Sequence, residues 1–286
     1  MKTKLRAYIA LMRLDRPIGI YLLLWPTLWA LWIASQGHPQ TKNLIILILG
    51  TVVARSAGCV INDFADRHID DKVSRTCHRP LANGIVQPFE AIILFCILGI
   101  LALVLVSFLN GLAILLAIVG AFITIIYPLL KRFTYFPQLI LGFAMSFGVP
   151  VAFAAETGHL SYLTAIIFLI SYLWVIIYDT FYAMSDRADD LMIGVKSIAI
   201  YFSHYDRLIT SLLQGAMLLL LISLGWLLSL NIWFYLAIAV SVGLACYQQY
   251  LIKDREADRC LQAFLNNHWV GLTIFMGLFF SYLLVP

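Results

Sequence analysis

Nine long apolar runs, separated by short polar loops, take up most of the sequence. A helix needs about 17 to 25 predominantly apolar residues to cross a bilayer, and each run is near or above that length. Only 12% of the residues are charged and the mean hydropathy is +0.92, which excludes a soluble globular domain with a polar surface. The sequence therefore predicts a single all-α, polytopic membrane domain with nine transmembrane helices at about 17–35, 43–61, 88–109, 111–130, 136–156, 160–182, 208–229, 231–251 and 268–285.

The cations are distributed unevenly across these predicted spans. All Lys and Arg residues except Lys42 and Arg55 fall in the N-terminal segment or in loops on one side. Because cytoplasmic loops carry the excess of Lys and Arg, we expect a multi-pass protein of a bacterial inner membrane with its N-terminus inside. The net charge of +4 reflects this bias and an affinity for membrane lipid, and nucleic acid is not an expected partner.

Two acidic segments, Asn62–Asp70 and Asp179–Asp190, stand at the ends of apolar runs, where carboxylates are costly unless a cation or a function holds them. At about 100° per residue, each segment gathers its polar groups on one helical face. Facing carboxylates repel unless a divalent metal lies between them, and oxygen ligands favour Mg²⁺ shared with a phosphate or diphosphate. The residues on the two faces are Asn62, Asp63, Asp66 and Asp70, and Asp179, Tyr182, Asp186 and Asp190, with Asp189 beside them.

A basic loop follows each acidic segment and predicts an anion site. Lys72, Arg75 and Arg79 follow the first segment, and Lys196 follows the second. Carboxylates for metals and cations for the remaining phosphate oxygens are what a metal-bridged diphosphate requires. Within the second acidic face, the Tyr182 ring is a candidate to stabilise a developing cation.

Three other arginines have two readings each. Arg55 lies seven residues before Asn62, on the same helical face and roughly 10 Å deeper in the predicted span. It either receives a substrate carboxylate or phosphate, or it pairs with an aspartate of the spans. Arg13 and Arg132 flank predicted helices and are either cytoplasmic anchors or parts of the site.

The pattern Asn62-Asp63-x-x-Asp66-x-x-x-Asp70, followed by Arg75-Thr76-x-x-Arg79-Pro80-Leu81, resembles the first aspartate motif of the UbiA superfamily of intramembrane prenyltransferases. Likewise, the pattern Asp179-x-x-Tyr182-Ala183-x-x-Asp186-x-x-Asp189-Asp190 resembles the second aspartate motif of that superfamily. Within the superfamily, the helix-one segment from Arg13 to Trp32 is most similar to the branch that prenylates 4-hydroxybenzoate in ubiquinone biosynthesis.

This resemblance implies a central cavity, Mg²⁺ as cofactor, and polyprenyl diphosphate and 4-hydroxybenzoate as substrates, with the prenyl group joined to the ring carbon ortho to the hydroxyl. It also implies roles for the individual side chains. These are metal binding by Asn62, Asp66, Asp70, Asp186 and Asp190, catalysis by Asp63, Asp189 and Tyr182, diphosphate binding by Lys72, Arg75, Arg79, Lys196 and Asp179, and benzoate binding by Arg55, Arg13 or Arg132.

Other acceptors remain open within the superfamily, namely a dihydroxynaphthoate, homogentisate or haem. An ion-coupled transporter is the alternative from another class, but its acids are expected near the middle of the membrane. Here every acid except Glu156 falls on or near the predicted cytoplasmic side. A weak internal repeat, with halves at about 1–130 and 131–251 and the helix at 268–285 appended, is also expected.

Overall fold

The computed structural model describes residues 2–67, 76–130 and 134–284. Helices account for most of these residues, and no strand occurs among them, which confirms the all-α class. In chain order the helices are α1 (Lys2–Leu11), α2 (Ile18–Ala34), α3 (Thr41–Asp66), α4 (Pro88–Val106), α5 (Gly111–Leu130), α6 (Pro137–Met145), α7 (Gly148–Thr157), α8 (Tyr162–Ile193), α9 (Ile198–Phe202), α10 (Asp206–Leu227), α11 (Ile232–Leu251) and α12 (Ala257–Leu283).

Fewer helices than the predicted nine are long enough, among the described residues, to count as membrane spans. Among the described residues, seven helical segments are long and apolar enough to cross a membrane, with α6 and α7 taken together and α9 joined to α10. Two shorter apolar helices, Ile18–Ala34 and Gly111–Tyr127, fall below that length. The membrane class is thus supported, and the count of nine stays a prediction.

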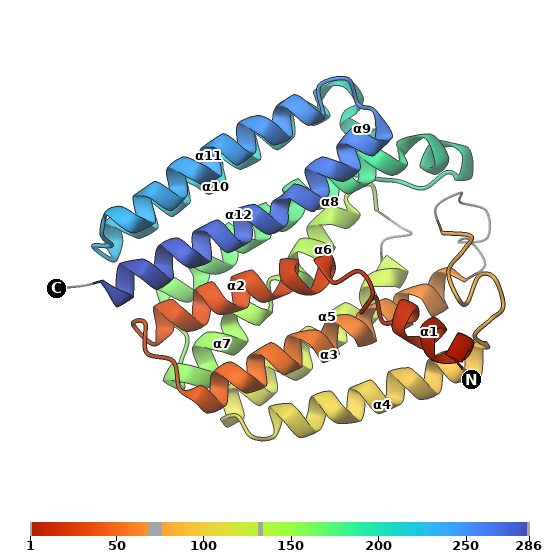
Figure 1. Ribbon diagram of the computed structural model, residues 1–286, viewed down its shortest axis with the longest axis horizontal. Coiled ribbons are helices and arrows are strands. Elements are labelled where there is room, and N and C mark those ends of the chain that lie inside the picture. Colours follow the sequence, from red (N-terminus) through yellow and green to blue (C-terminus); the bar gives the residue numbers. More distant parts are fainter. Residues whose placement is uncertain (1, 68–75, 131–133, 285–286) are drawn as a thin grey trace.

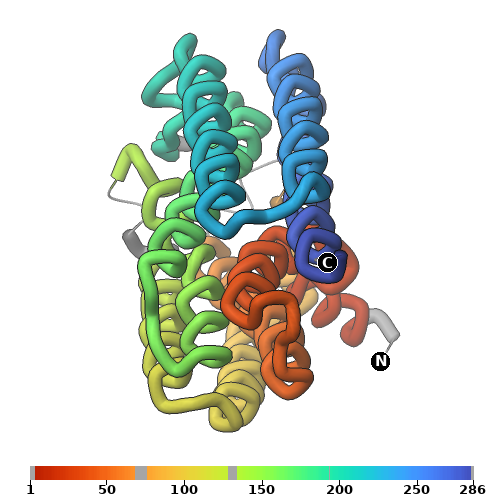
Figure 2. The backbone as a smooth tube through the Cα atoms, turned by 90° about the vertical axis from the view of Figure 1, so that its left-hand side faces the viewer, coloured from red at the N-terminus to blue at the C-terminus, as the bar shows by residue number. Residues whose placement is uncertain are grey.

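The helices lie roughly side by side, with α4 and α11 at opposite edges and α2, α8 and α12 between them (Figures 1 and 2). Burial follows this arrangement. In their most apolar windows, 56% of the residues are buried in α8 but only 11% in α4. The exposed apolar surface of α4, including Ile93 and Ile97, is suited to contact lipid.

Two aromatic side chains fill the centre of the bundle. Trp29 of α2 and Trp174 of α8 are at most 1% exposed, and their ring centroids lie 5.2 Å apart. Each indole N–H has an acceptor, since Trp29 donates to the carbonyl of Gly271 and Trp174 donates to the Asn267 side chain. A Cβ at Gly271 would lie 2.3 Å from Trp25, so α12 needs glycine there to approach α2.

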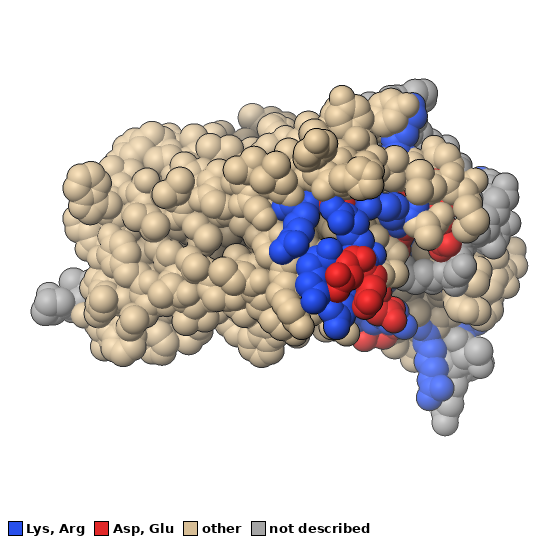
Figure 3. All heavy atoms as spheres, turned by 90° about the horizontal axis from the view of Figure 1, so that it is seen from above, with Lys and Arg blue, Asp and Glu red and all other residues tan. Residues whose placement is uncertain are grey.

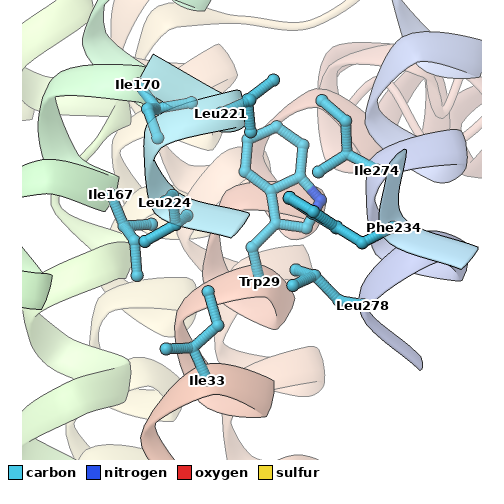
Figure 4. Close-up of a pocket in the computed structure, with 9 residues that line it drawn as sticks. All are labelled: Trp29, Ile33, Ile167, Ile170, Leu221, Leu224, Phe234, Ile274 and Leu278. Atoms are coloured by element: carbon cyan, nitrogen blue, oxygen red, sulfur yellow. The ribbon is translucent and has the colours of Figure 1, made fainter. Parts of the chain in front are cut away.

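A small apolar cavity of about 10 Å³ lies beside Trp29, between α2, α8, α10, α11 and α12 (Figure 4). Its lining is entirely hydrocarbon and aromatic: Trp29, Ile33, Ile167, Ile170, Leu221, Leu224, Phe234, Ile274 and Leu278. This volume has room for about one water molecule, far below the roughly 300–1,000 Å³ of ordinary ligand sites. A long chain therefore cannot be accommodated in this pocket alone.

Charged residues concentrate at one end of the bundle, here named the charged end, which carries α1, α9 and the C-termini of α3 and α8 (Figure 1). On the face shown in Figure 3, charged atoms gather toward the connection between α11 and α12. Helix α1 is fixed at this end by Glu90 of α4, which accepts from Lys4 at 2.5 Å and from Tyr8 at 2.9 Å. The hydrogen bond to Glu90 raises the pKa of the Lys4 ammonium above its usual value.

Candidate active site

Helix α8 is 32 residues long, or about 48 Å at 1.5 Å per residue. A hydrocarbon core is only about 30 Å thick, so the last turns of α8, which carry Asp179–Asp190, reach the charged end. The helix ends at Gly194, whose φ of +74° suits glycine, and the Val195 amide donates to the Asp190 carbonyl at 2.9 Å. The second acidic segment is therefore part of a continuous helix, as predicted.

The described part of the first acidic segment, from Asn62 to Asp66, forms the last turns of α3, where Asp63 is 2% and Asp66 is 7% exposed. Asp63 is the centre of an ion-pair cluster. Arg13 Nη2 donates to both carboxylate oxygens of Asp63, at 2.9 and 3.0 Å, and Arg79 Nη1 donates to Oδ1 at 3.0 Å. The segment between α1 and α2 and the segment before α4 are thereby fixed to the end of α3.

This cluster unites three residues to which the sequence assigned three different roles. Asp63 was expected as a spare catalytic carboxylate, Arg79 as a diphosphate ligand and Arg13 as a benzoate ligand. In the structure, both oxygens of Asp63 are engaged by guanidinium groups, so its immediate effect is to position these two arginines. Arg13 also donates to the Ala10 carbonyl at 2.8 Å and has a φ of +57°.

Arg55 lies deeper in α3, facing α2 and α8. A Cβ at Gly19 of α2 would lie 2.5 Å from Arg55 Nε, so the guanidinium lies directly against the α2 backbone. Arg55 Nε is buried and makes no hydrogen bond within the described part of the chain. Its electrostatic neighbours include Tyr178, Asp179 and Tyr182 of α8. Arg55 therefore extends from α3 toward the second acidic segment.

Tyr127 of α5 lies within electrostatic range of residues from both acidic segments. Its phenol interacts electrostatically with Asp66 of α3, with Asp179 and Tyr182 of α8, and with Arg55. Sequence reasoning left the end of α5 open between membrane anchor and site, through Arg132, and gave Tyr127 no role, because no spacing within α5 reveals which helices lie opposite. The segments α3, α5 and α8 together surround one polar site.

Other predicted residues lie around this site with distinct contacts. The Tyr182 ring packs on Phe264 of α12, with centroids 4.9 Å apart. The Lys196 ammonium lies 4.4 Å from the centre of the Tyr135 ring. Asn62, Asp186, Asp189 and Asp190 are all partly exposed at the ends of α3 and α8. Four further predicted residues, Asp70, Lys72, Arg75 and Arg132, lie outside the described residues.

The donor set fits Mg²⁺ by its chemistry. The groups that α3 and α8 bring to the site are carboxylates and one amide, and hard oxygen donors suit this ion. Among the described residues, no three His, Cys, Asp or Glu side chains form a compact metal site. Mg²⁺ is usually held by one or two carboxylates together with substrate phosphates, so two facing acidic helices can hold it without a closed protein cage.

A membrane bundle with carboxylate-bearing helices and arginines at one end defines a class of integral membrane protein suited to an anionic ligand that carries a metal ion. Comparison with known proteins makes this class specific. The chain belongs to the UbiA prenyltransferase family, whose model matches residues 23–279.

Two named relatives match almost the whole chain. One is 4-hydroxybenzoate octaprenyltransferase of Coxiella burnetii (strain CbuK_Q154), 51% identical over 282 residues, covering 99% of this chain and 98% of the relative. The other has the same name and comes from Nitrosococcus oceani, with 52% identity over 283 residues and 99% of each chain covered.

Solved structures confirm the fold. A UbiA homolog from Aeropyrum pernix K1 superposes with a TM-score of 0.79 at 23% identity, covering 90% of this chain and 96% of that one. A UbiA homolog from Archaeoglobus fulgidus, solved with GPP and Mg²⁺, gives a TM-score of 0.77 at 15% identity, covering 98% and 100%.

Proposed function

We propose that this protein transfers a polyprenyl group from its diphosphate to the ring carbon ortho to the hydroxyl of 4-hydroxybenzoate, releasing diphosphate, in ubiquinone biosynthesis. The observation that carries the proposal is that Asp66, Asp179 and Arg55 all lie within electrostatic range of Tyr127. Carboxylates suited to a metal-bound diphosphate thus lie near a cation suited to the carboxylate of an aromatic acid. The relatives named above, about half identical over nearly their full length, support the choice of substrates.

We assign binding of the diphosphate to the charged end of the bundle. Mg²⁺, when bound by Asn62, Asp66 and Asp70 on one side and Asp186 and Asp190 on the other, supplies neutralisation of the leaving diphosphate. Arg79, positioned by Asp63, and Lys196 provide cations for the remaining oxygens, together with Lys72 and Arg75. Asp179 faces this region from one turn below Tyr182.

The acceptor end lies deeper, around Arg55. A guanidinium whose Nε lacks a hydrogen-bond acceptor in the described part of the chain is suited to fork onto a carboxylate. The C–O bond of the prenyl diphosphate breaks, a C–C bond forms to the ring, and the ring carbon releases a proton. Tyr182 and Asp189 are assigned to stabilise positive charge on the allylic carbon.

The rest of the prenyl chain must lie outside the apolar cavity beside Trp29, because that cavity of about 10 Å³ is too small for it. We place the chain between the helices and along lipid. We also assign nine spans, counting the shorter helices α2 and α5, and place the charged end on the cytoplasmic side, as the positive-inside rule indicates.

The test is to incubate the purified protein with Mg²⁺, octaprenyl and shorter polyprenyl diphosphates, and a panel of aromatic acids. Mass spectrometry of the products should show prenylated 4-hydroxybenzoate, formed only when Mg²⁺ is present. The panel includes 1,4-dihydroxy-2-naphthoate and homogentisate. Prenylation of one of these in preference to 4-hydroxybenzoate would contradict the proposed acceptor, and release of diphosphate without any coupled product would contradict the transfer.

A further inference from the structure

A second buried ion-pair cluster lies at the charged end and is built around Asp206, the first residue of α10. Asp206 is fully buried, and its side chain accepts from two arginines. Arg187 of α8 donates from Nη2 to Oδ2. Arg255, in the connection between α11 and α12, donates to Oδ1 from Nη2 at 2.8 Å and from Nε at 3.1 Å.

Backbone contacts extend the cluster to the segment that follows α8. Arg187 Nη2 also donates to the carbonyl of Ala199 in α9, at 2.8 Å. Arg255 Nη2 donates to the carbonyl of His204 at 2.8 Å, and Arg255 itself has a φ of +56°, a region that non-glycine residues enter at a cost. Asp206 therefore joins α8, α9, α10 and the connection between α11 and α12.

Arg187 matters because of its place on α8. It follows Asp186 directly and lies three residues before Asp190, which is the spacing of neighbours on a helical surface. Both aspartates are assigned to the metal site. A guanidinium released from Asp206 would thus have Asp190 as its nearest carboxylate on α8. In the structure its hydrogen bonds go to Asp206 and Ala199 instead, on the side of α8 that meets α10.

We propose that Asp206 is a positioning residue that holds Arg187 away from Asp186 and Asp190, so that this guanidinium does not compete with the metal for the two carboxylates. This inference rests on the proposed function for the identity of the metal site. Arg187 belongs to the sequence of the second motif but acts as its structural support. Asp206 acts only through Arg187 and does not touch substrate.

The central experiment compares Asp206→Asn, Arg187→Gln and the double variant. In Asp206→Asn, the released guanidinium of Arg187 competes with Mg²⁺ for the carboxylates of Asp186 and Asp190. The Mg²⁺ concentration for half-maximal turnover should therefore rise roughly tenfold, the scale on which a neighbouring charge acts on a carboxylate. In the double variant the competing cation is gone, and the half-maximal concentration should return to within about twofold of the wild type.

A binding measurement separates this inference from the proposed function. Mn²⁺ is titrated into the protein, and the free ion is followed by its electron paramagnetic resonance signal. We expect Asp206→Asn to bind Mn²⁺ most weakly and the double variant to bind it about as tightly as the wild type. This titration reports on the cluster even if 4-hydroxybenzoate proves not to be the acceptor.

Two further variants serve as controls. Asp254→Asn removes an acid from the same connection as Arg255, where it pairs with Lys253 and Arg259 but is 52% exposed, and metal dependence should not change. Arg255→Gln leaves Arg187 paired with Asp206, so it should lower thermal stability without weakening Mn²⁺ binding. The Arg255→Gln variant also tests the proposal if Asp206→Asn does not fold, because weakened Mn²⁺ binding in Arg255→Gln would contradict the role proposed for Asp206.

Unchanged Mg²⁺ dependence and Mn²⁺ binding in folded Asp206→Asn would overturn the proposal. So would a double variant that is no better than Asp206→Asn, since a merely structural role is not rescued by removing Arg187. If Arg187→Gln alone raised the KM for the prenyl diphosphate, Arg187 would belong to the diphosphate site itself, which would also overturn the proposal.

Discussion

Gly19 of α2 and Arg55 of α3 are in such close contact that any side chain at position 19 would force the guanidinium to move: a Cβ there would lie 2.5 Å from Arg55 Nε and 2.7 Å from Nη2. Gly19→Ala should therefore displace the guanidinium and raise the KM for 4-hydroxybenzoate by about tenfold, within the 1–3 kcal/mol typical of overpacking. Steady-state kinetics check this. Gly50→Ala, on α3 with nothing within 4 Å of the added Cβ, is the control and should behave as the wild type.

Removing the Arg55 charge should be more severe than displacing it. Arg55→Met keeps much of the bulk, and it should weaken use of 4-hydroxybenzoate by about 1.5–3 kcal/mol, the scale of a hydrogen bond to a charged group. The KM for the prenyl diphosphate should change much less. If the diphosphate constant rises and the benzoate constant does not, Arg55 belongs to the leaving-group site, and Arg13 becomes the next candidate for the benzoate carboxylate.

Asp66→Asn and Asp186→Asn should each abolish turnover while the protein stays inserted and folded, because each removes one metal ligand from a different helix. Turnover at several Mg²⁺ concentrations, together with size-exclusion profiles, checks both points. Asp258→Asn, an exposed acid in the first turn of α12, is the control. Rates near those of the wild type in both site variants would rule out the metal-bridged arrangement.

Asp63→Asn should destabilise the protein, because it leaves Arg13 and Arg79 without their shared carboxylate. Breaking a buried ion pair in this way costs about 3–5 kcal/mol, so the thermal unfolding temperature in detergent should fall by several degrees. The variant Arg13→Met/Asp63→Asn, which also removes one of the cations, should recover part of this loss. An unfolding temperature unchanged by Asp63→Asn would show that the cluster contributes nothing to the folded state.

Orientation can be tested with single cysteines in a background without the five native ones. His159→Cys, exposed in the loop after α7, should react with a membrane-impermeant maleimide added to intact cells. Asp254→Cys, between α11 and α12, should react only after the membrane is opened. The reverse pattern would place the charged end outside and contradict a cytoplasmic supply of 4-hydroxybenzoate.

Single-helix periodicity predicted those features of the site that lie along one helix. The second acidic segment is helical throughout, and the first is helical as far as Asp66, as their spacing indicated. The contacts of Asp63 with Arg13 and of Asp206 with Arg187 were not predictable in this way. Each joins segments that are distant along the chain, and the spacing within a helix carries no information about its neighbours.

Helix boundaries were misjudged where polar side chains find partners inside the bundle. The last span was predicted to begin at residue 268, but α12 begins at Ala257. Asn266 and Asn267 lower the local hydropathy, yet they accept hydrogen bonds from Gln248 and Trp174. The predicted span 136–156 is divided into α6 and α7 near Ser146, whose hydroxyl lies 2.9 Å from that of Ser171. The predicted internal repeat stays a prediction.

The buried pair of Trp29 and Trp174 has a consequence for the energetics of the cell membrane. A polar site inside a bilayer offers protons and small ions a path for part of the distance across it. Between that site and the opposite end stand two indoles with satisfied N–H groups and a pocket lined only by apolar side chains, which stays dry. The bundle can thus hold a hydrated reaction centre without dissipating the proton-motive force.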